Sequence, residues 1–148
     1  MPCHHKFHQY LNLNKGYNNP DIEHLDFEPI TLIVGTFNPI WPDGNNADWF
    51  YGRVRNNYLW DVLPRLYNYP HNLRTNGHNH LNWKQFCFDN QIALTDLIYS
   101  INDADENNEE HQDILRTYLD TSIADYFEDF TFTQVTDILD QFPSIQNV

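Results

Sequence analysis

The sequence predicts an α/β protein, because strand-like and helix-like segments alternate along the chain. Two short aliphatic runs, at residues 30–35 and 92–98, have the length and continuity of buried strands in a parallel sheet. Between them, residues 57–66 place Leu59, Val62 and Leu63 on one helical face, and residues 81–88 follow as a short helix. Strand, helix and strand in this order favour two strands that lie parallel in one sheet.

The segments on either side are harder to predict. Residues 111–118 and 133–141 have the apolar spacing of amphipathic helices, and residues 144–148 predict the opening of a third strand. We therefore expect the natural chain to continue past residue 148, with the domain incomplete here. Residues 1–28 are polar, rich in His and Asn and without a sustained period, which predicts a loosely packed, solvated N-terminal arm before a domain at 29–148.

Composition limits the class of protein. A chain of 148 residues with 16% aromatic residues is long enough for one core and too apolar for disorder, so we expect a single domain and a monomer. Cys3 and Cys87 lie outside any C-x-x-C pair, which favours reduced thiols. Because the chain starts without an apolar signal segment and contains no run of membrane-spanning length, we expect a cytoplasmic protein with no membrane partner.

Charge is distributed unevenly along the chain. The formal net charge is −13, which opposes binding to a polyanion such as nucleic acid. Residues 53–84, however, hold five basic residues against one acid, whereas residues 96–140 hold thirteen acids against one base. The middle of the chain is therefore predicted to face phosphate, and the C-terminal third to form a solvated acidic surface.

Ligands bind in open parallel sheets near the carboxyl ends of the strands, where two of three motifs in this chain occur, and the remaining motif follows the first strand at a distance. The three motifs are Gly-Thr-Phe-Asn-Pro at 35–39, Phe-Tyr-Gly-Arg-Val-Arg-Asn-Asn-Tyr at 50–58, and Ile-Ala-Leu-Thr-Asp-Leu-Ile at 92–98. In order and spacing, the chain resembles the mismatch-specific and hypoxanthine-type branches of the uracil-DNA glycosylase superfamily over residues 30–101. The resemblance implies a three-layer α/β/α fold with a short, mostly parallel central sheet.

It also implies a function. Members of this superfamily excise a damaged or mispaired base, such as uracil, hypoxanthine or a mismatched base, from DNA. The base is first flipped out of the duplex, and its N-glycosidic bond is then hydrolysed. By resemblance, Asn38 orients the attacking water, Tyr51 stacks on the flipped base, and Asn56 places a second polar group near the base or sugar. Thr36 and Phe37 contact the base, Phe37 through its backbone N–H.

The implied chemistry suits these residue types. Breaking the bond builds positive charge on the sugar and negative charge on the base, so the site needs a positioned water, hydrogen-bond donors and an aromatic platform, without metal or cofactor. Asparagine orients water but takes no proton, so catalysis through Asn38 is expected to be slow. Arg53 and Arg55 are expected to contact DNA phosphates.

Each of these positions has a plainer interpretation. Asn38 is also the residue type of an Asx turn before a proline. Tyr51 has the character of a core aromatic, and Asn56 that of a helix N-cap. Arg53 and Arg55 are equally consistent with surface pairs to acidic residues nearby in the sequence, Asp43 and Asp48.

Two departures from the superfamily favour an alternative function. The motif of H-P-S type that follows the last strand in the superfamily is missing, and the chain is acidic where those proteins have basic DNA-facing surfaces. A non-catalytic binding or interaction domain on the same fold is therefore the rival hypothesis, and hydrolysis of free nucleosides is a further one. Three histidines at positions 71, 78 and 80 lack the partners of a metal site, so none is predicted.

Overall fold

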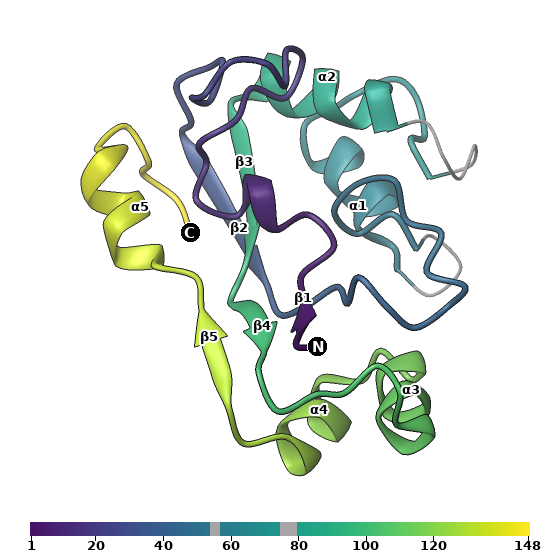
Figure 1. The fold of residues 1–148 in the computed structure, drawn as a ribbon. Helices are drawn as coiled ribbons and strands as arrows, with labels where there is room; N and C mark the ends of the chain where they lie inside the picture. The colour runs from purple at the N-terminus through teal and green to yellow at the C-terminus, as the bar shows by residue number, and fades with distance from the viewer. Residues whose placement is uncertain (54–56, 75–79) are drawn as a thin grey trace.

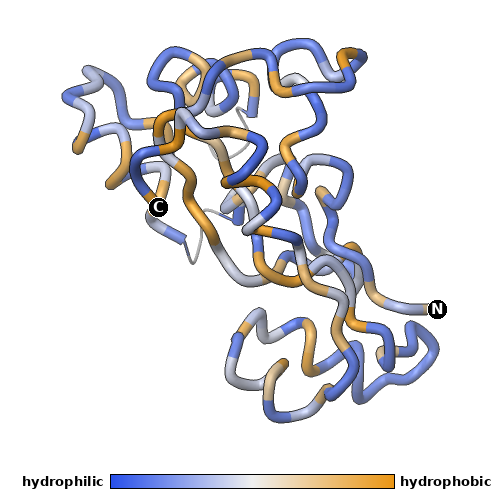
Figure 2. The backbone as a smooth tube through the Cα atoms, turned by 90° about the vertical axis from the view of Figure 1, so that its left-hand side faces the viewer, coloured by the Kyte–Doolittle hydropathy of each residue, from blue (hydrophilic) through white to orange (hydrophobic). Residues whose placement is uncertain are grey.

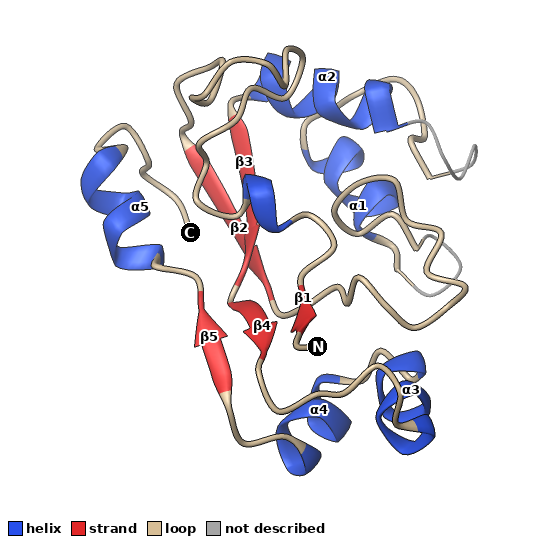
Figure 3. Cartoon of the chain, in the orientation of Figure 1, coloured by secondary structure: helices blue, strands red, loops and turns tan. Residues whose placement is uncertain are grey.

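The computed structural model describes residues 1–53, 57–74 and 80–148, and its fold is mixed α/β, as predicted (Figure 1). The strands are β1 (Cys3–His4), β2 (Thr31–Gly35), β3 (Ile92–Asp96), β4 (Ile98–Ile101) and β5 (Phe130–Phe132). The helices are α1 (Leu59–Leu66), α2 (His80–Asn90), α3 (Glu109–Arg116), α4 (Asp120–Tyr126) and α5 (Val135–Gln141), with a 3-10 turn η1 (His8–Tyr10). Figure 3 shows the long loops that join β1 to β2 and β2 to α1.

The described strands form two small sheets. β2 and β3 pair in parallel, with Thr31 opposite Ile92 and Gly35 opposite Asp96. In the other sheet β4 lies between β1 and β5 and is antiparallel to both. The parallel pair agrees with the predicted sheet, whereas β1, β4 and β5 depart from that prediction because they form a separate antiparallel sheet. The run at 92–98 predicts one strand, but the chain passes from one sheet to the other at Leu97, which is 46% exposed.

Residues near the C-terminus lie along β2 but form an isolated bridge there in place of the predicted third strand. The Leu32 N–H donates to the Asn147 carbonyl at 2.9 Å, and the Gln146 N–H donates to the Ile30 carbonyl at 2.8 Å. Asn147 forms an isolated parallel bridge with Thr31. β2 therefore has β3 on one edge and this terminal segment on the other. In Figure 1, α1 and α2 lie on one side of this pair of strands and α5 lies on the other.

The first of two hydrophobic clusters surrounds β2 and β3 and contains the largest buried aromatic side chains. Trp60 of α1 and Trp83 of α2 stack with ring centroids 5.0 Å apart, which joins the two helices. Each indole N–H donates to a backbone carbonyl, that of Phe50 and that of Leu73 respectively, so neither polar atom is left unpaired. The buried members of this first cluster are Leu11, Leu13, Tyr17, Leu25, Leu32, Trp49, Phe50, Trp60, Leu63, Leu73, Trp83, Phe86, Cys87, Ile92, Ala93, Leu94 and Ile138.

The prediction of a loosely packed arm at 1–28 is wrong. Leu11, Leu13 and Tyr17 are almost completely buried in the first cluster. The Tyr17 hydroxyl accepts the Leu94 N–H at 2.9 Å, and the Thr95 hydroxyl donates to the Leu11 carbonyl at 2.7 Å. These residues cover β3 without forming a helix or strand of their own, so their burial leaves no period in the sequence.

The second cluster is smaller and lies beyond the carboxyl ends of β2 and β3, where α3 and α4 are found (Figure 1). Its buried members are Cys3, Phe37, Trp41, Ile98, Ile101, Ala104, Leu115, Ile123 and Phe127. Figure 2 shows hydrophobic residues along the central strands, whereas the outer loops are mostly hydrophilic. Over the described parts of the chain, no helix has the length and apolar character needed to cross a membrane.

Candidate functional site

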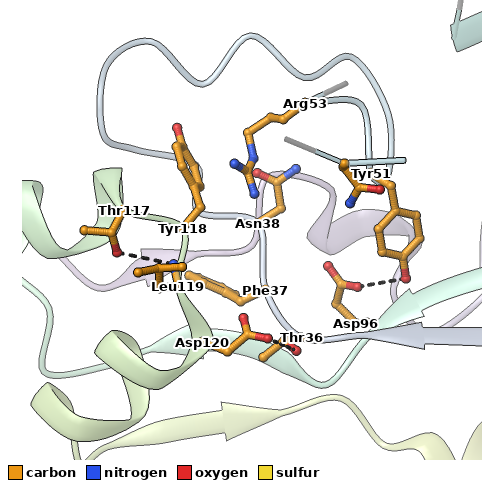
Figure 4. A pocket seen from close by; sticks show the side chains of 12 residues that line it. Thr36, Phe37, Asn38, Tyr51, Arg53, Asp96, Thr117, Tyr118, Leu119 and Asp120 are labelled. Carbon is orange, nitrogen blue, oxygen red and sulfur yellow. Dashed lines mark hydrogen bonds between the residues drawn. The ribbon is translucent and has the colours of Figure 1, made fainter. Parts of the chain in front are cut away.

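A cavity of about 450 Å³ opens where β2 and β3 end (Figure 4). That volume lies within the range of small-molecule sites. It brings together five predicted site residues from two separate segments: Thr36, Phe37, Asn38, Tyr51 and Arg53. The other lining residues are Gly35, Asn57, Asp96, Thr117, Tyr118, Leu119 and Asp120. The predicted residues Arg55 and Asn56 lie outside the described ranges, so their placement stays a prediction.

Asn38 lies at the base of the cavity and is 7% exposed. Its side-chain oxygen accepts a short hydrogen bond from the Asn45 Nδ2, which also donates to the Pro39 carbonyl at 2.6 Å. The Asn38 backbone carbonyl accepts the Lys6 N–H at 2.7 Å. Asn38 is thus held by the side chain of Asn45, from the same loop after β2, an arrangement that fixes the orientation of its amide.

Tyr51 enters the cavity from the loop that precedes α1. Its φ of 58° is unusual for a residue other than glycine, and its hydroxyl donates to the Asp96 Oδ1 and the Thr95 carbonyl, both at 3.3 Å. Burial, reinforced by the negative charge of Asp96, raises the pKa of Tyr51 well above its usual value. The hydroxyl therefore stays protonated and acts as a donor to the end of β3.

Asp96, the last residue of β3, also lines the cavity and is held by a histidine from the N-terminal segment. His5 Nε2 lies 2.6 Å from the Asp96 Oδ2, and the His5 side chain is fully buried. The expectation that His5 is solvated is therefore wrong. An antiparallel bridge between His5 and Pro39 places the imidazole there, beside the segment that carries Asn38.

Gly35 allows this close arrangement. It lies opposite Asp96 in the parallel pair, and a β-carbon at this position would overlap the Asp96 Oδ1 and lie 2.7 Å from the Tyr51 hydroxyl oxygen. Glycine is thus the residue that lets the Asp96 carboxylate and the Tyr51 hydroxyl meet at the end of the sheet.

The other wall of the cavity comes from the segment that joins α3 to α4. The Thr36 hydroxyl donates to the Asp120 Oδ2 at 2.8 Å, and the Arg53 guanidinium lies 3.5 Å from the centre of the Tyr118 ring. Partial burial lowers the pKa of Arg53, although Tyr118 and Asp120 oppose that shift. Arg53 therefore lines the cavity and stacks on the Tyr118 ring, as Figure 4 shows. The phosphate contact expected from the sequence stays a prediction.

Sequence reasoning missed His5 and the wall formed by Tyr118 and Asp120. Asp96 belongs to the motif at 92–98, from which no role for this residue is predicted. Asp120 sits in the acidic third of the chain, where a solvated surface is the ordinary expectation. Nothing in the local pattern around Tyr118 indicates that its ring turns toward Arg53, although its φ of 53° marks an unusual backbone.

The chemistry available in the cavity is that of hydrogen bonding, aromatic stacking and carboxylates. Within residues 1–53, 57–74 and 80–148, no three His, Cys, Asp or Glu side chains are grouped to hold a metal ion. Amide, hydroxyl and carboxylate groups converge there with the rings of Phe37, Tyr51 and Tyr118. Such a cavity can position water and bind a planar polar molecule.

Comparison with known proteins adds no relative. The chain matches no family model, no curated protein and no solved structure.

Proposed function

We propose that this protein is a DNA glycosylase that hydrolyses the N-glycosidic bond of a damaged or mispaired base. The observation that carries the proposal is the convergence of Thr36, Phe37, Asn38, Tyr51 and Arg53 on one cavity. These residues belong to two of the motifs that carry the resemblance to the superfamily. Asn38 and Tyr51 both belong to the loop between β2 and α1, in two separate motifs, so a purely local turn at 36–39 does not account for their convergence.

In this proposal the base leaves the duplex and enters the cavity, where aromatic rings face it. Asn38 orients the attacking water, because its amide is fixed by Asn45 and cannot rotate freely. Tyr51 provides the platform for the base, and its hydroxyl, bonded to Asp96, fixes the position of the ring. We propose that the backbone N–H of Phe37 and the side chain of Thr36 contact the edge of the base.

The partner is DNA that contains such a base, acted on by a monomer in the cytoplasm. Arg53 lines the cavity and provides positive charge for a nearby phosphate, whereas Asp96 and Asp120 place negative charge in the same cavity. Because these charges oppose one another, we expect weak binding to intact duplex DNA that falls further as salt increases. Mispaired bases leave the stack at a lower cost than paired ones, which favours them as substrates.

The proposal is tested by incubating the purified protein with labelled oligonucleotides that carry uracil, hypoxanthine, a G·T pair or a G·U pair. Alkali then cleaves the abasic sites that base release leaves. Strand cleavage above background on one of these substrates supports the proposal and identifies the base. Binding to them without cleavage at any protein concentration favours the alternative, a non-catalytic binding domain on the same fold.

A further inference from the structure

We infer that Asp96 is a catalytic residue that accepts the proton of the attacking water, and that His5 is the residue that positions it. The inference rests on the proposed function and deepens it. Asn38 orients water but has no site that takes up a proton at neutral pH. Hydrolysis releases one, so a group in the cavity must receive it.

The cavity offers two carboxylates for this role, and only one is fixed in place. Asp96 is 4% exposed, at the end of a buried strand, whereas Asp120 is exposed at the start of α4 and bonded to the Thr36 hydroxyl. A buried carboxylate with both oxygens engaged keeps one geometry through the reaction. Asp96 is therefore the better placed of the two.

The hydrogen bonds around His5 define which atoms carry protons. The Phe7 N–H donates to the His5 Nδ1 at 2.9 Å, so this nitrogen carries no hydrogen. The neutral ring then has its hydrogen on Nε2 and donates it to the Asp96 Oδ2 at 2.6 Å. Tyr51 donates to the other oxygen, Oδ1, at 3.3 Å, a longer contact that leaves this oxygen available to the cavity.

The surrounding residues hold the histidine ring in that orientation. It packs against Phe50 with centroids 5.5 Å apart and against Phe37 at 5.8 Å. The His5 N–H donates to the Tyr99 carbonyl at 2.8 Å, which ties its backbone to β4. A fully buried imidazole, bonded through both ring nitrogens and packed against two aromatic rings, presents its Nε2 hydrogen to Asp96.

The proposed step balances as follows. The water oxygen forms a bond to C1′ of the sugar, and the C1′–N bond breaks with its electron pair remaining on the base. One water proton passes to the Asp96 Oδ1 and is later released to solvent. The departing base takes up a proton from solvent, so the net reaction consumes one water.

The test compares Asp96→Asn with Asp26→Asn on whichever oligonucleotide the unaltered protein cleaves. Asp26 is a matched control, because its carboxylate also accepts backbone N–H groups, from Tyr17 and Asn18, but lies outside the cavity lining. We expect Asp96→Asn to lower the single-turnover rate of base release by about 10²–10⁴-fold, the range of a lost general base, with little change in affinity for the oligonucleotide. Asp26→Asn should change the rate by no more than a few-fold.

The His5 variants test the positioning role and remain informative if Asp96→Asn fails to fold. His5→Phe keeps a ring against Phe50 and removes the donor, so kcat should fall by about 10-fold or more while KM stays within a few-fold. His5→Gln restores a donor and should recover part of kcat, which a purely structural role would not predict.

The outcomes separate the two proposals. Base release by the unaltered protein together with unchanged rates for folded Asp96→Asn, or for His5→Phe where Asp96→Asn does not fold, overturns this inference and leaves the glycosylase standing. Absence of release by the unaltered protein on every substrate overturns the proposed function and this inference with it.

Discussion

The two hydrophobic clusters of the molecule differ in size and in what covers them. The first cluster, around β2 and β3, holds the largest fully buried side chains, among them Trp49, Trp60 and Trp83. The second, beside α3 and α4, has fewer buried members, and most of them, including Leu115 and Ile123, come from the acidic segment at 96–140. The cavity lies where these two regions meet, since Gly35 ends a strand of the first and Phe37 is buried in the second.

The two regions therefore form different sides of the cavity. The strand ends and their hydrogen bonds fix Asn38, Tyr51 and Asp96 on a well-packed base. The opposite wall, with Tyr118 and Asp120, depends on a smaller core and on two contacts across the cavity. Regions with less buried apolar surface open at lower free energy, so we expect the wall to open before the base of the cavity.

The largest expected effect is on the first cluster. Trp83→Ala removes the stack on Trp60 and the hydrogen bond to the Leu73 carbonyl, so the free energy of unfolding should fall by about 3–5 kcal/mol. Urea unfolding followed by circular dichroism measures it. Trp83→Phe keeps an aromatic ring and should lose clearly less; equal losses for the two variants would contradict the role given to the stacked indole.

A smaller loss is expected in the second cluster. Leu115 is fully buried in α3, and Leu115→Ala should lower the free energy of unfolding by roughly 3 kcal/mol. Leu66→Ala is the matched control, because Leu66 is 72% exposed at the end of α1 and should change stability by no more than about 0.5 kcal/mol. Similar urea midpoints for both variants would mean that the second cluster contributes little to the fold.

The contact between Arg53 and Tyr118 spans the cavity, and its removal should have a more modest effect. Tyr118→Leu removes the ring beneath the guanidinium and should lower the free energy of unfolding by about 0.5–2 kcal/mol. Tyr118→Phe keeps the ring and should stay close to the unaltered protein in the same urea experiment. A loss from Tyr118→Phe as large as that from Tyr118→Leu would assign the effect to the hydroxyl instead.

The smallest expected effect is on the reaction rates of the two thiols. Cys87 lies in the first cluster and Cys3 in the second, so each thiol measures the exposure of one cluster. Burial raises the pKa of Cys3 to about 12, although a backbone hydrogen bond to Trp41 opposes the shift, and burial also raises the pKa of Cys87. Because the thiolate is the reactive form, both thiols should react slowly with a thiol reagent near pH 8. With increasing urea, Cys3 in the Cys87→Ala variant should react before Cys87 in the Cys3→Ala variant, since it belongs to the smaller cluster.

Simultaneous reaction of the two thiols would contradict this comparison and show that the clusters unfold as one unit.

Stability is not expected to change with the ionisation of either thiol below about pH 9, the ordinary pKa of a cysteine thiol, because both thiols remain protonated in the folded and unfolded states. Above it the unfolded chain loses protons first, so this contribution to stability declines as pH rises toward about 12.

How much of the structure the sequence predicts depends on whether a feature is set by neighbouring residues or by residues far apart in the chain. The strands at 31–35 and 92–96 follow from short aliphatic runs, and Asn38 and Tyr51, which line one cavity, belong to two of the motifs that carry the resemblance. Local patterns of this kind are sufficient for the parallel pair and for one side of the cavity.

The remaining features depend on contacts between distant residues. His5 and Asp96 are 91 positions apart, and a histidine in a polar segment carries no local sign that it will be buried beside a carboxylate. The burial of Leu11 and Tyr17 has no period, and β5 is three residues long. Such features are decided by which segments pack together, which one short stretch of sequence does not specify.

The most direct test of the account compares base release by the unaltered protein with release by Asn38→Ala and Asn12→Ala. Asn12 is a matched control, since it lines a different cavity together with His8 and Lys15. We predict that the unaltered protein and Asn12→Ala cleave the same oligonucleotide at similar rates, whereas Asn38→Ala loses at least about 10-fold in single-turnover rate. Equal rates for all three proteins would contradict the claim that the cavity at the end of β2 is the site of base excision.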